Sequence, residues 1–172
     1  MAVTDIQNWS KEQGVLWLHF DYTHPEAEEW LMESSGLAKI IAQALLEDET
    51  RPHATMINNG MLIALRGINH NPSAEADDMV ALRMWVDPHR IVTSLRRKLG
   101  AADIIATDLM AGSGPKNSGD FLVSMINHIV HGMSDTVNDF EERTADYEEV
   151  LTRVSATSLQ NYVVKLLLFV AT

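Results

Sequence analysis

The spacing of hydrophobic and polar positions changes several times along the first fifty residues, and each change predicts an element. Val15–Phe20 is a short and mostly apolar run, which is typical of a strand buried on both faces. Pro25 then begins a helix, because a proline at the first helical position lacks an N–H that would have no partner there. A second helix is predicted over Gly36–Glu47. Its apolar residues share one face: Leu37, Ile40, Ile41, Ala44 and Leu45.

Four extended segments follow, and turn residues divide them into two hairpins. The segments are Pro52–Asn58, Met61–Ile68, Met79–Val86 and Ile91–Arg97. Asn59-Gly60 lies between the first two and is the strongest short hairpin signal, whereas Pro88 marks a turn between the last two. Two successive hairpins predict an antiparallel meander. The strand Val15–Phe20 must join this sheet, because a single strand cannot bury its apolar run alone.

The hydrophobic period becomes helical from Ala101 onward. Ala101–Ala111 predicts one helix, and Ser118 is a suitable N-cap for a second helix that runs to about Arg153. The apolar residues of this second helix recur at intervals of three and four with one gap: Leu122, Ile126, Ile129, Met133, Val137, Phe140, Tyr147, Leu151 and Val154. At 1.5 Å per residue the helix is a rod of roughly 50 Å, which is longer than a compact domain of this size is wide. We therefore expect it to project, or to pack against another chain.

Together these elements predict the α/β class. The expected architecture is an α/β/α layered domain, in which a mixed sheet with antiparallel hairpins is flanked by helices and followed by a long projecting helix. Residues 1–117 are expected to form the core of the domain. Residues 118–172 are expected to be the long helix and C-terminal tail of the same domain.

The amino-acid composition limits the kinds of binding site and partner that the chain can have. The 172 residues include no cysteine, which excludes a disulfide scaffold, thiolate metal sites and a cysteine nucleophile. The net charge of -11 argues against a nucleic-acid binder and suits a cationic partner, metal ions included. The acidic surplus lies in residues 1–50 and 101–172, whereas residues 51–100 are mildly basic. No apolar run reaches the roughly 20 residues that span a bilayer, and the N-terminus lacks a signal-peptide pattern, so we expect a soluble, cytoplasmic chain.

Candidate metal ligands lie on the long predicted helix. His128, His131 and Asp135 are spaced so that they share one face, and neutral imidazole with a carboxylate can hold zinc or a similar divalent ion. A second, acidic row contains Asp139, Glu142 and Asp146, whose mutual repulsion a cation would relieve. The same spacings are also typical of an ordinary solvated helix face, and no fixed zinc motif is present.

Other polar clusters carry weaker signals. His19, Asp21 and His24 follow the first strand, but Asp21 or Thr23 can equally cap the helix that begins at Pro25. The basic triplet Arg96–Lys98 is more typical of a solvated edge, or of a partner for acidic helices, than of a nucleic-acid patch. The chain has no Gly-x-Ser-x-Gly nucleophile motif, so we do not expect an enzyme and expect no organic cofactor.

Six runs of residues stand in an order that is informative as a whole. They are Leu16–Phe20, Ala44–His53, Gly60–Asn69, Met84–Asp87, Arg90–Arg97 and the Gly112–Pro115 loop before a long helix. In this order they resemble the N-terminal cytoplasmic domain of the CorA/ZntB family of divalent-cation transporters, and most closely its ZntB-like branch. The resemblance covers roughly residues 15–150. It implies an α/β/α unit, five copies of which form a cytoplasmic funnel for divalent cations such as zinc or magnesium.

Departures from the family define two functional hypotheses. The family's two membrane helices and the Gly-Met-Asn signature between them are missing, so we expect a truncated product, a fragment or a standalone relative that does not conduct ions alone. The leading hypothesis is the funnel domain of a CorA/ZntB-type transporter, which attracts cations, responds to metal and forms a homo-oligomer, a pentamer in the full-length family. It would lie in the cytoplasm or at the cytoplasmic face of the inner membrane. The alternative is a standalone interaction or scaffold module that binds a partner protein through the long helix.

Overall fold

The structure is a computed structural model that describes residues 10, 12, 14–48, 51–74 and 78–170. For residues 135 and 154–170 it describes the backbone but not the side chains. Two compact units make up the chain. The first is Met1–Met133 and the second is Ser134–Thr172, so the boundary lies inside a helix. Within the described ranges, no helix is both long enough and apolar enough to cross a membrane.

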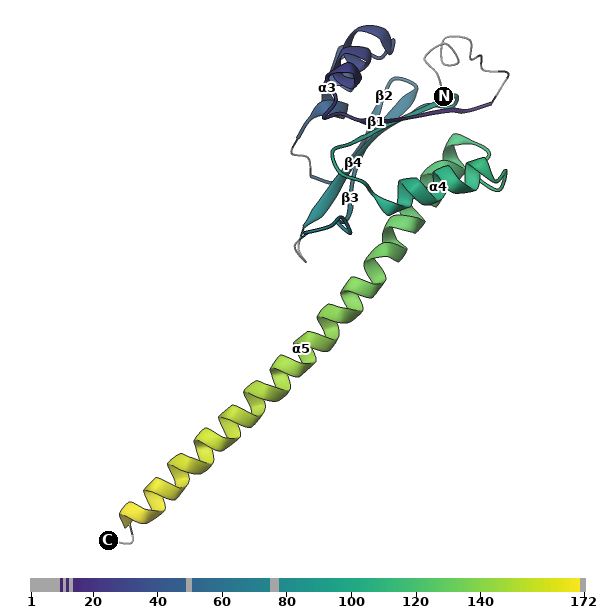
Figure 1. Cartoon of the computed structure of the whole chain (residues 1–172). Coiled ribbons are helices and arrows are strands. Elements are labelled where there is room, and N and C mark those ends of the chain that lie inside the picture. The colour runs from purple at the N-terminus through teal and green to yellow at the C-terminus, as the bar shows by residue number, and fades with distance from the viewer. Residues whose placement is uncertain (1–9, 11, 13, 49–50, 75–77, 171–172) are drawn as a thin grey trace. The chain divides into compact units, whose positions relative to one another are not determined.

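A five-stranded mixed sheet lies at the centre of the first unit (Figure 1). Its strands are β1 (Leu16–Asp21), β2 (His53–Ile57), β3 (Gly60–Ile68), β4 (Met79–Val86) and β5 (Arg90–Leu95), in the order β1-β5-β4-β3-β2. Strands β2 to β5 form the predicted antiparallel meander, and β1 joins it in parallel beside β5. The mixed sheet expected from the sequence is therefore confirmed.

One face of the sheet is covered by three short helical segments. They are α2 (Pro25–Glu29), the π-helix η2 (Trp30–Ser34) and α3 (Lys39–Leu46). Their apolar side chains meet alternate residues of the strands in one buried cluster, which comprises Leu16, Leu18, Leu31, Ile41, Leu45, Leu62, Trp85 and Val92. Pro25 begins α2 as predicted, but no side chain caps this helix, and Asp21 instead accepts hydrogen bonds from the backbone and hydroxyl of Thr23.

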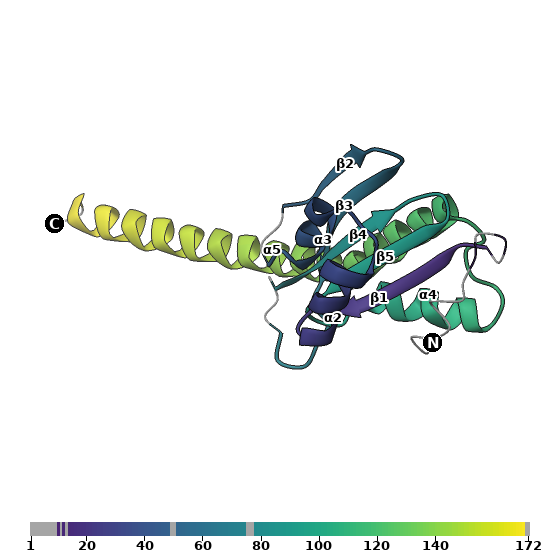
Figure 2. The same cartoon turned by 90° about the horizontal axis from the view of Figure 1, so that it is seen from above.

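The opposite face is covered by α4 (Gly100–Met110) and the start of α5 (Ser118–Val170) (Figure 2). Helix α5 contributes Phe121, Met125 and Ile129, which are buried against β3, β4, β5 and α4. Helices on both faces of a mixed sheet, followed by a long C-terminal helix, confirm the predicted fold class. Helix α5 has 53 residues and continues well beyond Arg153, where the predicted helix ended.

The first hairpin turn lies one residue earlier than its sequence signal predicted. Ile57 pairs with Gly60, so Asn58 and Asn59 form the two-residue loop and Asn58 adopts a positive φ of 52°. Gly60 belongs to β3 instead, and a Cβ at this position would overlap the ring of Trp85 on the neighbouring strand. The glycine is thus required for a close approach between strands.

Two predicted apolar faces are rotated relative to the observed ones. Ile40 was placed on the buried face of its helix but is 65% exposed, because α3 begins at Lys39 and turns Ile41, Ala42 and Leu45 to the sheet. On α5 the sheet receives Phe121 and Met125, whereas Ile126 is 39% exposed. Strand β1 is also less enclosed than predicted, since only Leu16 and Leu18 are fully buried.

The start of α5 is held by a different cap from the one predicted. Asn117 accepts a hydrogen bond from the backbone N–H of Asp120 at 2.9 Å, and its side-chain amide donates to the Asp120 carboxylate at 2.8 Å. These reciprocal bonds satisfy a donor that a helix N-terminus leaves unpaired. Ser118, the predicted N-cap, is already helical, and its hydroxyl donates instead to the carbonyl oxygen of Asp87 at 2.7 Å.

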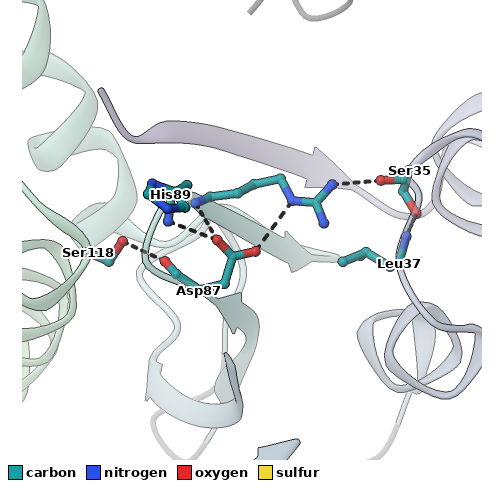
Figure 3. A network of polar contacts seen from close by, with 6 residues as sticks. Ser35, Leu37, Asp87, His89 and Ser118 are labelled. Atoms are coloured by element: carbon teal, nitrogen blue, oxygen red, sulfur yellow. Dashed lines mark hydrogen bonds and ion pairs between the residues drawn. The ribbon is translucent and has the colours of Figure 1, made fainter. Parts of the chain in front are cut away.

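A polar network around the β4–β5 turn links this helix start to the opposite layer (Figure 3). The Asp87 carboxylate accepts from the backbone N–H groups of His89 and Arg90, at 2.9 and 2.8 Å. The Arg90 guanidinium lies 3.8 Å from the same carboxylate and donates to the carbonyl oxygen of Ser35, after η2, at 2.6 Å. One tight turn therefore contacts both helical layers and fixes where α5 begins.

Candidate metal-binding site

The two histidines predicted on the long helix line a pocket of about 210 Å³ in the first unit. His128 is half-buried and His131 is exposed, one helical turn further along α5. Between them, Ile129 is only 7% exposed and packs into the core. The burial of this isoleucine sets the rotation of the helix, and so directs both imidazoles to the edge of the buried face.

A third imidazole, from His70, lines the same pocket and was not singled out in the sequence. His70 is two residues beyond the end of β3 and about sixty residues before the other two histidines. No local spacing connects such distant positions, because they meet only through the packing of α5 on β3. The only signal in the sequence was that a histidine follows a predicted strand by two residues.

Hydrogen bonds on both sides hold the segment that carries His70. Asn69 is only 5% exposed, and its backbone N–H donates to the carbonyl oxygen of Asp78 at 3.2 Å. The Asn69 side-chain oxygen accepts from the backbone and side-chain N–H groups of Asn71, at 3.0 and 2.6 Å. Asn71 also donates to the carbonyl oxygen of Lys98 at 3.0 Å, just before α4. The backbone at His70 is therefore fixed against two neighbouring elements.

The pocket forms where α5 and Leu99, the residue before α4, come close to the C-terminal end of β3. A Cβ on Gly67 would lie 2.7 Å from a methyl group of Leu99 and 3.6 Å from Ile129. The first distance is shorter than real contacts, so a side chain at position 67 would require the Leu99 methyl group to shift. The remaining lining is mainly apolar or glycine: Gly67, Ile68, Leu99, Gly100, Ala101, Ile104, Ile129 and Gly132.

Within the described part of the chain, no three side chains of His, Asp or Glu converge closely enough to hold a metal ion. The Nδ1 atom of His131 lies 3.2 Å from the carbonyl oxygen of Asn127, one turn earlier. A carbonyl oxygen only accepts, so Nδ1 carries the proton in this contact and the Nε2 lone pair points elsewhere. The Asp135 side chain lies outside the described residues. The ligand set expected from the sequence thus stays a prediction.

The predicted acidic row belongs to the second unit. Asp139 pairs with Arg143 at 3.7 Å, while Glu142 and Asp146 are exposed. Further along, Glu149 pairs with Arg153. Exposed pairs of this kind contribute only about 0.3–0.5 kcal/mol on a helix. The row therefore remains a surface that is largely solvated and rich in carboxylates.

The three polar residues near β1 that the sequence singled out, His19, Asp21 and His24, contact different partners. The His19 ring lies 2.7 Å from the Thr93 hydroxyl, and burial lowers its pKa from the ordinary value of 6.5, against the opposing charges of Asp103 and Asp21. Hydrogen bonds from Thr23 lower the pKa of Asp21. The exposed His24 lies 3.9 Å from the same carboxylate.

The basic triplet is engaged within the chain. Arg96 lies 3.6 Å from the Asp48 carboxylate after α3, and Arg97 lies 3.3 Å from Asp78. Both arginines therefore have acidic partners within the chain, but these partners lie beside elements rather than on a helix, and the exposed pairs also fit the solvated edge expected from the sequence. The pairs are exposed, so each contributes little to stability.

Comparison with known proteins identifies relatives for most of the chain. A sequence profile of the family described as "CorA-like Mg2+ transporter protein" matches residues 12–167. The zinc transport protein ZntB of Yersinia enterocolitica is 35% identical over 135 residues, which cover 78% of this chain and 41% of the relative. The divalent cation transporter CmaX of Pseudomonas aeruginosa is 37% identical over 135 residues, covering 74% of this chain and 41% of that protein. The chain thus spans less than half the length of these relatives.

Solved structures agree with the sequence matches. Full-length CmaX superimposes with a TM-score of 0.73 at 34% identity, over 79% of this chain and 42% of that one. The ZntB cytoplasmic domain from Vibrio parahaemolyticus gives a TM-score of 0.70 at 24% identity, over 76% of this chain and 54% of that one. At 24% identity the second match supports the fold alone, and it agrees with the layered α/β/α architecture described above.

Proposed function

The chain belongs to the family of CorA-like Mg2+ transporter proteins, and from this membership we propose that it serves as the cytoplasmic domain of a divalent-cation transporter. This proposal rests on the family match over residues 12–167, and relatives described as zinc and divalent-cation transporters support it. The family is one of transporters rather than enzymes. The domain would lie at the cytoplasmic face of the inner membrane, and the neighbour with the same fold is described as a ZntB cytoplasmic domain.

The proposed mechanism is electrostatic. The net charge of -11 gives the chain an attractive field for cations, and a surface of one sign raises the local concentration of counter-ions. On the second unit this surface comprises the acidic row Asp139, Glu142 and Asp146, whose exposed carboxylates suit weakly held Mg²⁺ or Zn²⁺. Packing of several copies would bring such rows together around a common path, so that cation binding at subunit contacts regulates the assembly.

Equilibrium dialysis against Mg²⁺ at low ionic strength tests this mechanism. The variant Asp139→Asn/Glu142→Gln/Asp146→Asn removes three charges from the acidic row and should reduce the excess of bound Mg²⁺. The matched control Glu26→Gln/Glu28→Gln/Glu29→Gln removes three exposed charges from α2, at the other end of the chain. An equal reduction in both variants would show that net charge alone attracts the ions, and the proposed surface would be wrong.

A second function is favoured by the apolar side chains of the second unit. Val137, Phe140, Tyr147 and Leu151 are exposed by 43–65% in the described structure, on a helix that is otherwise polar. The chain could therefore act as an interaction module that binds another protein through α5. Affinity capture with the intact chain distinguishes the two functions: one specific protein, recovered equally with and without divalent ions and lost in Phe140→Ser, would favour the module.

A further inference from the structure

We propose that a pocket at the C-terminal ends of β1 and β5 binds the phosphate group of a small molecule through Tyr22, Arg96 and Arg97. The pocket has a volume of about 450 Å³, within the range of small-molecule sites, and all of its lining lies in the first unit. The other lining residues are Asp48 and the start of β4, Met79–Ala81. The proposed ligand is an anion, so the site is distinct from the cation-attracting surface of the proposed function and does not rest on it.

The sheet topology creates this pocket. Strands β1 and β5 run parallel and end at the same level, so Tyr22 and Arg96, which follow them, lie at one edge of the sheet. Strand β4 begins at Met79 but pairs with β5 only over Arg83–Val86. In the described structure the first half of β4 therefore lacks a strand on its β5 side, and the pocket occupies that place. Ligands of open α/β sheets commonly bind at the carboxyl ends of strands.

The backbone of β4 adds a hydrogen-bond donor to the pocket. In an antiparallel pair, the N–H and C=O groups of alternate residues point to the same neighbouring strand. The hydrogen bond from the Asp87 N–H to the Arg90 carbonyl oxygen sets this alternation, so the backbone groups of Arg83 and Ala81 both point to the β5 side. Beyond the end of β5 this direction leads into the pocket, which Ala81 lines. An anion there would meet a backbone N–H as well as side chains.

The partners of Arg96 and Arg97 are exposed carboxylates. Arg96 lies 3.6 Å from Asp48 and Arg97 lies 3.3 Å from Asp78, and all four side chains are at least 40% exposed. Such pairs contribute little to stability, so exchanging a carboxylate for a phosphate disturbs the fold little. Each guanidinium presents five N–H donors in a planar fork, which matches the oxygens of a phosphate group. The two arginines are therefore suited to bind a phosphate between them.

A buried positive charge lies directly behind two residues of the pocket lining. Arg83 is 1% exposed, and its guanidinium donates to the Tyr22 hydroxyl at 3.5 Å and to the Asp48 carbonyl oxygen at 2.8 Å. Among the described residues its Nε has no hydrogen-bond acceptor, and no carboxylate forms an ion pair with the guanidinium. A buried charge without a counter-ion is unfavourable, so an anion in the adjacent pocket would supply the missing negative charge.

Three positive charges around one pocket favour a ligand with more than one negative charge. A phosphate monoester carries about -1.5 to -2 charges at pH 7, whereas a single carboxylate carries one. The Tyr22 hydroxyl donates to the Asp48 carboxylate at 3.1 Å, and burial raises the pKa of Tyr22 above its ordinary value of 10.0, so this donor stays protonated at neutral pH. A phosphate would take the place of the Asp48 carboxylate, whose side chain is 68% exposed and can rotate into solvent.

Calorimetric titration of the intact chain with inorganic phosphate and with AMP, in a chloride buffer, tests the site. We expect one phosphate group bound per chain, and no binding of adenosine, which lacks the phosphate. Arg96→Gln and Arg97→Gln should each weaken binding about tenfold or more, because each removes charged hydrogen bonds. Asp48→Asn should instead strengthen binding, because it removes the carboxylate that the phosphate replaces. Tighter binding of AMP than of inorganic phosphate would identify a phosphate ester as the ligand, and equal binding would identify the inorganic ion.

The matched control is Arg143→Gln/Arg153→Gln, since both arginines also pair with exposed carboxylates but lie on the second unit. It loses the same charge as Arg96→Gln/Arg97→Gln and should bind phosphate as the parent chain does. Equal losses in the two double variants would show that overall charge alone matters and would overturn the proposal. The absence of phosphate and AMP binding, or equally tight binding of acetate, would overturn it as well.

Thermal unfolding distinguishes a lost site from a lost fold. Phosphate should raise the melting temperature of the parent chain and of the control more than that of Arg96→Gln/Arg97→Gln. A double variant that unfolds cooperatively with a smaller shift supports the site, whereas an unchanged shift contradicts it. The Mg²⁺ dialysis that tests the proposed function changes none of these residues, so either proposal can fail while the other holds.

Discussion

Arg83 is a charged side chain that is only 1% exposed, in the middle of β4. Its guanidinium donates to the carbonyl oxygen of Asp48 at 2.8 Å, just beyond the end of α3, and lies 5.3 Å from the ring centre of Tyr22. The next strand adds the hydroxyl of Ser94, which donates to the carbonyl oxygen of Leu45. Carbonyl groups in the last turn of a helix lack intrahelical partners, so Ser94 caps the end of α3 at Leu45, whereas Arg83 anchors the segment two residues beyond the helix at Asp48.

Replacing this arginine should therefore destabilise the fold more than replacing an exposed one. Arg83→Met keeps most of the side-chain volume but leaves the Asp48 carbonyl unpaired, which costs about 1–3 kcal/mol. Arg96→Met removes only an exposed ion pair with Asp48 and should cost less than about 1 kcal/mol. Urea unfolding of both variants measures the difference, and equal losses would show that burial of Arg83 contributes nothing extra.

A methyl group at Gly60 should disrupt the contact between β3 and β4. Gly60→Ala would force Trp85 to move, because the added Cβ overlaps its ring, and overpacking of this kind costs about 1–3 kcal/mol. Gly100→Ala is the control: its Cβ meets nothing within 4 Å at the start of α4, so it should be neutral or stabilise the chain by up to about 1 kcal/mol. Thermal unfolding distinguishes the two, and similar melting temperatures would contradict the predicted clash.

His19 should make the stability of the fold depend on pH. Although its side chain keeps an exposed surface, desolvation of the ring lowers the pKa of His19 below 6.5 in the folded chain, so the unfolded chain binds more protons as the pH falls below about 6.5. The free energy of unfolding contributed by His19 is therefore highest above this pH and decreases as the pH falls towards the lower, folded pKa. His19→Asn, which retains a polar atom for Thr93, should weaken this dependence between pH 7.5 and about 5.5.

The measurement for His19 is a series of urea titrations across that pH range, with Asn127→Ala as the control. This replacement removes no ionisable group, so it should leave the pH dependence as in the parent chain. The lowered pKa of Asp21 also reduces stability in acid, but only as the pH falls through 3.8 and below, outside the range tested. A parallel pH dependence in His19→Asn would contradict the role given to this histidine.

At the scale of elements, helix α5 depends on how its first turn is attached. The Asn117 cap pairs with Asp120, and Ser118 joins the turn to the β4–β5 loop through Asp87. The same loop reaches the opposite layer through Arg90 and Ser35. Because the contacts of Phe121, Met125 and Ile129 follow directly, the position of this first turn also determines where His128 and His131 lie.

Removing the cap should destabilise the first unit by about 1 kcal/mol, the usual cost of replacing an N-cap residue by alanine. Asn117→Ala is the test, and Asn127→Ala, an exposed asparagine further along the same helix, is the control. The control should be neutral or slightly stabilising, because alanine has the higher helix propensity. Thermal unfolding followed by circular dichroism measures both, and a neutral Asn117→Ala would mean that Ser118 anchors the helix by itself.

At the scale of the whole molecule, charge and exposed apolar surface oppose each other. A net charge of -11 keeps copies of the chain apart, whereas the exposed side chains of the second unit favour association. Screening by salt weakens the repulsion but not the apolar contact. The proposed homo-oligomer should therefore be stronger at higher ionic strength.

Sedimentation equilibrium should detect this association. We expect the average mass of the intact chain to rise with protein concentration, and to rise further when NaCl is added. Phe140→Ser should reduce the effect, because it removes an apolar side chain that is 43% exposed on the second unit, while Asn138→Ser on the same helix should not. A monomer under all conditions would contradict self-association of the chain without further segments.

Local sequence patterns predicted the helices and strands well, because each such element depends mainly on neighbouring residues. Apolar runs separated by turn residues indicated the meander, and the helical spacing of apolar residues indicated the long helix. The errors occurred where a distant residue decides the outcome: Trp85 requires glycine at position 60, and the sheet selects Phe121 and Met125 rather than Ile126 as the buried face. A hydrophobic period indicates that a helix has an apolar face, but its exact rotation depends on the surface that it meets.

The sequence by itself determined the α/β class, the order of strands and helices, the excess of negative charge and the two histidines on the long helix. Each of these follows from composition or from spacing within one element. Only the tertiary structure added His70 to the same pocket, because this contact joins residues about sixty positions apart through the packing of Ile129 and Leu99 around Gly67. Such a site depends on which surfaces pack together, and that choice is made by the whole core rather than by any one segment.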